Sequence, residues 1–114
     1  MSVSYLVFYR GRANDQQSFI DRYRDIHVPI LKRFPGIQDI SLLTPMSWKD
    51  KHPVNPGQFT LIVQMKFASI KALELALQSP ERDEAREDFK KFSVFGGEIW
   101  HQAMKLEEQL EKPG

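Results

Sequence analysis

The sequence predicts an α+β fold in which strands and helices follow one another in the order β-α-β-β-α-β. Three observations predict it. Apolar residues recur with a period of two in residues 3–10 and 58–67, as they do in strands. They recur at helical spacing in residues 15–37 and 69–92, and glycines and prolines separate these stretches. At 114 residues the chain is long enough for one core, so we expect a single domain over residues 1–114.

The first strand is predicted from Val3 to Arg10. Side chains on both of its faces are mostly apolar, which indicates a sheet that is covered on both sides. Gly11 to Asn14 is expected to turn the chain into the first helix. Arg10 and Arg12 near this turn are either solvated loop charges or groups that attract an anionic substrate.

The stretch from Asp15 to Ile37 reads as an amphipathic helix that ends at Pro35-Gly36. Asn14 or Asp15 is placed to cap its start. Pro29 lies inside the pattern and cannot donate a hydrogen bond to the preceding turn. We therefore expect a kink or an early end there.

His27 is the first candidate catalytic residue, because it lies on the apolar face of this helix beside the disturbed turn. Tyr23 lies one turn earlier on the same face. A histidine held there could act as a general acid or base near neutral pH, with Tyr23 beside it. The alternative is a packed histidine that hydrogen-bonds a free carbonyl.

The middle of the chain is predicted to hold a second strand over Ile37–Thr44, followed by a long irregular segment, Pro45–Gly57. Trp48 in this segment is expected to lie over a pocket or to pack on a partner subunit. The third strand is predicted over Gln58–Phe67. Its apolar face should carry the helices, while Gln64 lies on a mixed face that suits a cavity wall and a ligand contact. The apolar face comprises Phe59, Leu61, Val63, Met65 and Phe67, and the mixed face Thr60, Ile62, Gln64 and Lys66.

The second helical region is predicted to begin at Ser69 and to begin again at Ser79, where Pro80 takes the first helical position. Asp88 within it is expected to be a surface or capping charge. Gly96-Gly97 then breaks the pattern, and Glu98–Lys105 reads as the last strand. His101 on this strand either reaches an interior, as a ligand contact, or fills a half-buried edge position.

The predicted order of elements is that of a ferredoxin-like fold, a four-stranded antiparallel sheet with helices on one face. The other face carries apolar residues such as Leu6 and Phe8 and needs a cover. A second copy packed sheet to sheet supplies that cover, so we expect a homodimer.

Composition excludes several classes of function. A net charge of +1 leaves no basic field for nucleic acid, and no apolar run is long enough for a membrane span. The chain has no cysteine, no basic leader, and no nucleotide-binding or zinc motif. We therefore expect a cytoplasmic protein without cofactor or metal, whose chemistry is acid–base work by histidine and tyrosine in a mostly apolar chamber.

The chain also resembles a known family. Phe19, Tyr23, His27-Val28-Pro29 and Phe34-Pro35-Gly36-Ile37 are similar to the F-x(3)-Y-x(3)-H-x-P helix and P-G turn of the EthD-like family of dimeric α+β barrel proteins. Ser79-Pro80-Glu81 and Asp88-x(3)-Phe92 resemble its second helical region. The resemblance implies two sheets forming a barrel with a cavity in each half, and a link to the degradation of ethers and related xenobiotics.

Two functions remain open at this point. The first is a small cofactor-free enzyme, similar to an isomerase, cyclase or monooxygenase, that acts on a small hydrophobic, aromatic or lactone- or polyketide-like substrate. Its catalytic residues would be His27 and Tyr23, and its ligand contacts Gln64, His101 and Trp48. The alternative is a non-catalytic dimeric binding or accessory protein that holds a hydrophobic intermediate for a partner oxygenase.

Overall fold

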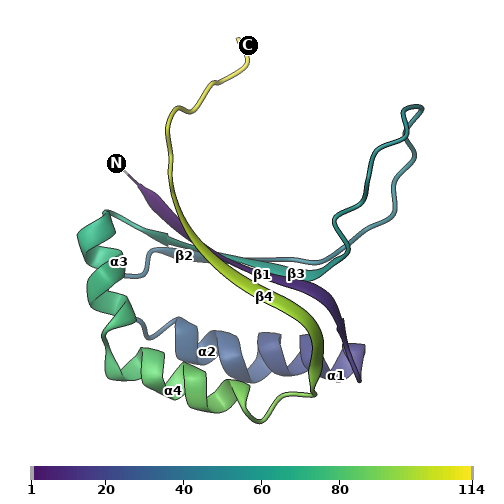
Figure 1. Ribbon diagram of the computed structural model, residues 1–114. Coiled ribbons are helices and arrows are strands. Elements are labelled where there is room, and N and C mark those ends of the chain that lie inside the picture. Colours follow the sequence, from purple (N-terminus) through teal and green to yellow (C-terminus); the bar gives the residue numbers. More distant parts are fainter. Residues whose placement is uncertain (1, 114) are drawn as a thin grey trace.

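The computed structural model describes residues 2–113. Four strands form one antiparallel sheet in the order β2-β3-β1-β4, and the helices pack against one of its faces (Figure 1). This confirms the predicted α+β, ferredoxin-like architecture. The strands are β1 (Val3–Ala13), β2 (Asp39–Leu43), β3 (Phe59–Phe67) and β4 (Phe95–Lys105). The helices are α1 (Gln16–Arg22), α2 (Val28–Leu31), α3 (Ile70–Leu77) and α4 (Pro80–Phe89), with a π-helical turn η1 (Tyr23–His27) between α1 and α2.

The core lies between the helices and the helix-facing side of the sheet. Its densest part is a cluster of aromatic rings around Tyr9 of β1 and Phe19 of α1, whose ring centroids lie 5.5 Å apart. Phe19 is fully buried, and its ring also lies 5.3 Å from that of Phe92. Edge-to-face contacts of Tyr9 with Tyr23 of η1, and of Phe19 with Phe89 of α4, join these helices to the same cluster.

β1 and β4 are longer than predicted. The expected turn at Gly11 and the expected break at Gly96-Gly97 are both wrong, because the two strands pair there, Gly11 with Gly97 and Arg12 with Gly96. Gly11 has a φ of +118°, and a Cβ on it would lie 2.5 Å from the Gly96 oxygen. The glycines therefore mark a close approach of two backbones within the sheet.

β3 departs from strict alternation at its first residues. Leu61, Val63, Met65 and Phe67 face the helices as predicted, but the prediction for Phe59 is wrong. Its ring lies 5.8 Å from that of Phe8, on the opposite face, and Thr60 is buried instead. The cause is a shift in the β1–β3 register between Tyr9 and Arg10. Tyr9 pairs with Leu61 but Arg10 pairs with Phe59, so Thr60 is an extra residue in β3 and Phe59 turns to the other face.

The first helix begins where predicted, because the Asp15 side chain accepts a hydrogen bond from the backbone N–H of Ser18. The expected disturbance near Pro29 lies one turn earlier, in η1. There the N–H of Val28 reaches the carbonyl of Tyr23, five residues back. Pro29 follows in the first turn of α2, where its missing N–H is tolerated. The helix ends at Leu31, earlier than predicted.

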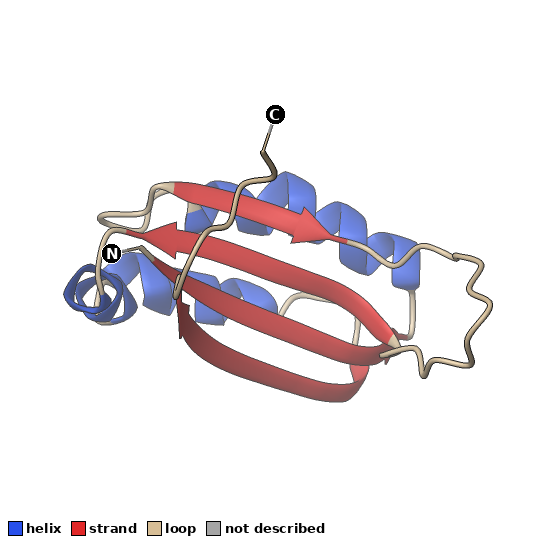
Figure 2. Cartoon of the chain, turned by 90° about the horizontal axis from the view of Figure 1, so that it is seen from above, coloured by secondary structure: helices blue, strands red, loops and turns tan. Residues whose placement is uncertain are grey.

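The face of the sheet opposite the helices is uncovered within this chain (Figure 2). It carries Ser4, Leu6, Phe8, Leu43, Ile62, Gln64, Trp100 and Met104, as the strand registers show. The segments 44–58 and 106–113 also leave the sheet on the side away from the helices (Figure 1). Among residues 2–113, no helix is both long enough and apolar enough to cross a bilayer.

Candidate active site

A cavity of about 70 Å³ lies between the sheet and the helices, beside His27. An open groove of about 640 Å³ beside α4 and β4 shares lining residues with it, namely Leu77, Arg82, Arg86, Ile99 and His101. Polar groups at the cavity are Tyr5, Tyr9, Tyr23, His27, Arg82, Arg86 and His101, and the rest of its wall is apolar. A mostly apolar cavity with a few convergent polar groups is the usual form of a small-molecule site.

The centre of the site is a buried pair formed by His27 of η1 and Asp88 of α4. The His27 Nδ1 atom lies 3.0 Å from Asp88 Oδ2, and the Arg22 guanidinium donates to Asp88 Oδ1 at 2.5 Å. His27 is 5% exposed and Asp88 6%. The pair is thus shielded from solvent, where hydrogen bonds to a charged group are strong.

Both groups of the pair have shifted pKa values. Burial lowers the pKa of His27 below 6.5, and the hydrogen bond and negative charge of Asp88 offset that effect only in part. Burial is also the largest single influence on Asp88 and opposes its ionisation. The hydrogen bonds from His27 and Arg22, together with their charges, outweigh it and hold the pKa of Asp88 below 3.8. At neutral pH the pair is therefore a neutral imidazole beside a carboxylate.

This charge state decides which ring nitrogen carries the proton. A carboxylate only accepts hydrogen bonds, so His27 Nδ1 must donate to Asp88. The lone pair then lies on Nε2, which has no hydrogen-bond partner among the described side chains. His27 also lines the cavity. The arrangement is that of a histidine base oriented by an aspartate.

The local sequence explains why these side chains meet. Phe19, Tyr23 and His27 follow one another at intervals of four residues, and η1 keeps all three on the buried side. Asp88 of α4 and Phe92, which follows that helix, are also four residues apart, and both contact the His27 ring. The His27 ring lies 4.7 Å from that of Tyr23 and 5.3 Å from that of Phe92, so both rings restrict its motion.

Two tyrosine hydroxyls lie at the cavity as a hydrogen-bonded pair. The Tyr9 and Tyr23 oxygens are 3.1 Å apart. Burial raises the pKa of Tyr9 to about 12 and that of Tyr23 well above 10.0, so both stay protonated. One of the two protons forms the bond between them. The other remains available to an acceptor in the cavity.

His101 of β4 lies at the same cavity, on its outer side. Its Nδ1 atom is 2.7 Å from the hydroxyl of Tyr5. Burial lowers the pKa of His101, and the charges of Arg82 and Arg86 lower it further. The structure thus brings together three of the five predicted site residues, His27, Tyr23 and His101.

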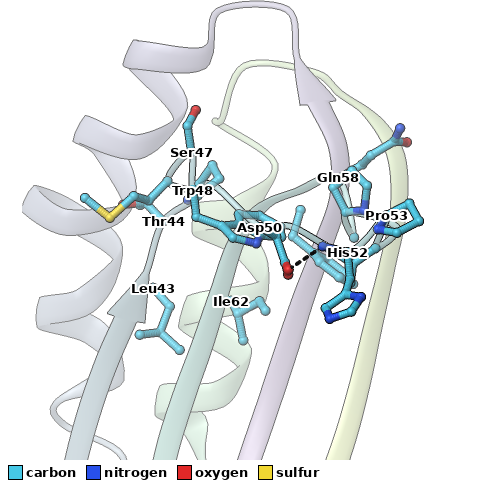
Figure 3. Close-up of a pocket in the computed structure, with 15 residues that line it drawn as sticks. Leu43, Thr44, Ser47, Trp48, Asp50, His52, Pro53, Gln58 and Ile62 are labelled. Atoms are coloured by element: carbon cyan, nitrogen blue, oxygen red, sulfur yellow. Dashed lines mark hydrogen bonds between the residues drawn. The ribbon is translucent and has the colours of Figure 1, made fainter.

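Gln64 and Trp48 lie elsewhere. Gln64 is on the uncovered face of the sheet, where its amide donates to the Ser4 hydroxyl at 3.1 Å, so it does not share the His27 cavity. Trp48 is 60% exposed in the long loop. There it lines a separate hollow of about 830 Å³ with His52, whose backbone N–H donates to the Asp50 carboxylate (Figure 3).

The prediction that Asp88 is a surface or capping charge is wrong. The sequence held a signal for its burial, since Asp88 lies three residues after Ala85 and four before Phe92, both of which are buried. The sequence reasoning missed two partners of the site, Arg22 and Tyr9. Tyr9 follows Val3, Tyr5 and Val7 at intervals of two residues on the helix-facing side of β1. In the described part of the chain, no group of three or more His, Asp or Glu side chains is arranged to hold a metal ion.

The fold and the histidine–aspartate pair define a small α+β protein of ferredoxin-like architecture with a buried polar site under its sheet. The family model of the EthD domain matches residues 12–96. The chain therefore belongs to the EthD family, as its H-x-P helix indicated. Comparison with curated proteins found no match.

Solved structures extend the likeness over nearly the whole chain. An ethyl tert-butyl ether (EthD) family protein from Bacillus halodurans is 22% identical, with a TM-score of 0.75 over 93% of this chain and 99% of its own. The hydroxynitrile lyase of Passiflora edulis is 18% identical, with a TM-score of 0.67 over 96% and 97%. SnoaB, a cofactor-independent oxygenase from Streptomyces nogalater, is 14% identical, with a TM-score of 0.65 over 97% and 98%. At these identities the likeness shows the fold alone.

Another match bears on assembly. A protein from Thermobifida fusca, described as dimeric and ferredoxin-like, is 7% identical to this chain, with a TM-score of 0.66 over 93% of this chain and 92% of its own. Structural neighbours of this chain are thus dimeric proteins of the same fold.

Proposed function

We propose that this protein is a small cofactor-free enzyme in which His27 moves a proton to or from a small, largely hydrophobic substrate. Aromatic, lactone and polyketide-like molecules are the substrate classes that suit the cavity. The observation that carries the proposal is the unpartnered Nε2 of a neutral, buried His27 whose other nitrogen is held by Asp88. A titratable side chain at a cavity whose pKa is shifted by burial and by a specific charged partner is a candidate for a functional group.

The reaction begins when Nε2 of His27 takes a proton from an acidic C–H or O–H of the substrate. The electron pair left behind moves to a substrate oxygen, and Asp88 stabilises the imidazolium that forms. The spare hydroxyl proton of the Tyr9–Tyr23 pair donates to that oxygen. Return of the proton to a different atom of the substrate completes an isomerisation. Hydroxynitrile lyase and cofactor-independent oxygenase chemistry, named for two of the matched structures, also fit a base in an apolar cavity.

Solvent deuterium exchange tests this proposal even though the product is not identified. The protein is incubated in D₂O with aromatic ketones, lactones and ether-degradation products, and exchange at acidic C–H positions is followed by NMR. We expect His27→Asn to lose at least about 100-fold in exchange rate. His52→Asn, a change to an exposed loop histidine, serves as the matched control and should leave the rate unchanged. Equal rates for wild type and His27→Asn would rule out the catalytic assignment.

A second function is favoured by the packing around His27. Its ring lies against Tyr23 and Phe92, and the cavity in the single chain is small for a substrate. A non-catalytic protein that holds a hydrophobic intermediate for a partner oxygenase would need the volume of the ring but not its proton. Tight binding of a panel compound, without turnover and without loss of affinity in Asp88→Asn, would select this function.

We further propose that two copies associate through the uncovered face of the sheet. Its apolar side chains include Phe8 and Ile62, which are half-buried in the single chain, and Trp100, which is 43% exposed. Removal of this surface from water favours association. Phe8→Glu should convert a dimer to a monomer in sedimentation velocity. Lys90→Glu, at the exposed residue that follows α4, should not, and a monomeric wild type would contradict the proposal.

A further inference from the structure

Two arginines of α4 stand between the buried cavity and the solvent. Arg82 and Arg86 are four residues apart on one side of the helix, and both line the cavity beside His27. Both also line the open groove outside it. They therefore lie at the boundary between the two spaces, here called the mouth of the cavity, and would meet a molecule that enters from the groove.

Some charged side chains of α4 form ion pairs, whereas the two arginines at the mouth do not. Glu84 on the same helix pairs with Arg33, and Glu87 pairs with Lys90 at 2.9 Å. Arg82 and Arg86 form no ion pair among the described residues. Asp83 also lines the groove, but not the inner cavity. The inner cavity wall thus presents two positive charges and no acidic residue.

The position of Arg82 is also unusual for a helix. α4 begins at Pro80 after the Ser79 cap, so Arg82 lies in its first turn. A positive charge there opposes the helix dipole, whose positive end is at the N-terminus. Capping and dipole effects would favour an acidic residue at this position. Helix stability therefore does not explain an arginine at the mouth of the cavity.

We propose that the His27 cavity takes a small apolar acid, whose carboxylate is held by Arg82 and Arg86 at the mouth while its apolar body reaches the histidine. This inference rests on the proposed function, because it names the class of its substrate. Guanidinium groups suit the purpose, since they are always charged and can grip a carboxylate with two parallel hydrogen bonds.

His101 completes the anion site. Its Nδ1 atom lies 2.7 Å from the Tyr5 hydroxyl. When Tyr5 donates to Nδ1, the neutral ring carries its proton on Nε2 and can give a third hydrogen bond to the carboxylate. The carboxylate of the bound acid then lies at the outer end of the cavity, and the His27–Asp88 pair lies at the inner end. A bound acid would thus be oriented with its reactive carbon toward His27.

Binding of benzoate and benzamide to the full-length protein tests the proposal directly. The two probes share shape and differ in charge. Binding is followed by titration of the histidine ring resonances in NMR at low salt. We expect benzoate to shift the His101 and His27 resonances in a saturable way, and benzamide to bind at least about tenfold more weakly.

Variants then assign the charge that is recognised. Arg82→Gln/Arg86→Gln should weaken benzoate binding at least tenfold. The matched control Lys90→Gln/Lys91→Gln removes the same charge at the exposed end of α4 and should leave binding unchanged. Absence of benzoate binding, equal binding of benzamide, or unchanged binding in the arginine variant would overturn the proposal.

The same titration on Asp88→Asn separates this inference from the proposed function. Benzoate binding needs the arginines and not the base, so the variant should still bind. If the arginines bind benzoate but His27→Asn keeps wild-type exchange rates, the anion site stands and the catalytic assignment fails. If His27 is required for exchange but benzoate does not bind, the catalytic assignment stands and the anion site fails.

Discussion

The replacement Asp88→Asn gives the sharpest test of the buried pair, because asparagine keeps the shape of the side chain and exchanges one acceptor oxygen for an NH₂ donor. Arg22 can only donate, so the remaining oxygen of the new amide stays on the guanidinium. The NH₂ group then faces His27. To accept its hydrogen bond, the imidazole must move its own proton from Nδ1 to Nε2. The base that faces the cavity is thereby lost.

The magnitude of the stability change is set by the two bonds. Both are bonds to a carboxylate in wild type, at 3.0 Å and 2.5 Å, and both become bonds to a neutral amide in the variant. Each loses about 1 kcal/mol of its contribution, so the free energy of unfolding should fall by about 2 kcal/mol. Asp88→Ala, which leaves Arg22 without its partner, should lose about 3–5 kcal/mol.

Two assays check this reasoning. Nitrogen-15 chemical shifts of the imidazole should show Nδ1 protonated in wild type and Nε2 protonated in Asp88→Asn. Urea denaturation should give the stability loss, and Glu87→Gln, which changes an exposed carboxylate paired with Lys90, should leave the free energy of unfolding nearly unchanged. A variant with an unchanged tautomer and a stability equal to that of Glu87→Gln would refute the reasoning.

Three further predictions concern stability. Tyr23→Phe removes one hydroxyl of a buried pair and should lower the free energy of unfolding by about 1 kcal/mol in urea denaturation, with little change in exchange rate if the other hydroxyl takes over the donation. The folded-state pKa values of His27 and Asp88 lie below 6.5 and 3.8, so the unfolded chain binds more protons than the folded chain just below each value. Stability should therefore fall as the pH falls below about 6.5 and again below about 3.8, and Asp88→Asn should remove the share of the second loss that Asp88 contributes. Gly11→Ala should cost about 3 kcal/mol or more because of its positive φ and the contact with the Gly96 oxygen, whereas Gly96→Ala, whose added Cβ would meet its nearest atom at 3.4 Å, should cost less than about 1 kcal/mol in the same assay.

Most of the fold could be read from apolar periodicity, because β1, β3 and the helices bury one face in this chain. The errors occur where a backbone effect overrides the periodicity. Gly11 and Gly97 looked like chain breaks, but they permit two strands to pass closely. The register shift opposite Tyr9 moved Phe59 to the other face. Neither the close approach at the glycines nor the register shift has a sequence pattern of its own, because both depend on the pairing of the strands in the sheet.

The site could be predicted only in part for a related reason. His27 and Tyr23 share one helix, so their proximity followed from helical spacing. The partner of His27 is 61 residues away in sequence, and only the packing of α4 against η1 brings Asp88 to the ring. Gln64 was placed on the correct strand, but the sequence did not show which face of the sheet would border the cavity.

The π-helical turn connects these observations. In an ordinary α-helix the N–H of Val28 would bond to the carbonyl four residues earlier. In η1 it bonds to the carbonyl of Tyr23, five residues earlier, so the turn contains one extra residue. The extra residue rotates the side chains of α2 by about 100° relative to those of α1. Arg22 before the turn and His27 at its end can then reach the same carboxylate from two directions. A turn of this kind is less favourable than a regular one, and the bonds that it permits to Asp88 stabilise it. The same bonds hold the base in its reactive tautomer, so the π-helical turn and the orientation of His27 depend on the same carboxylate.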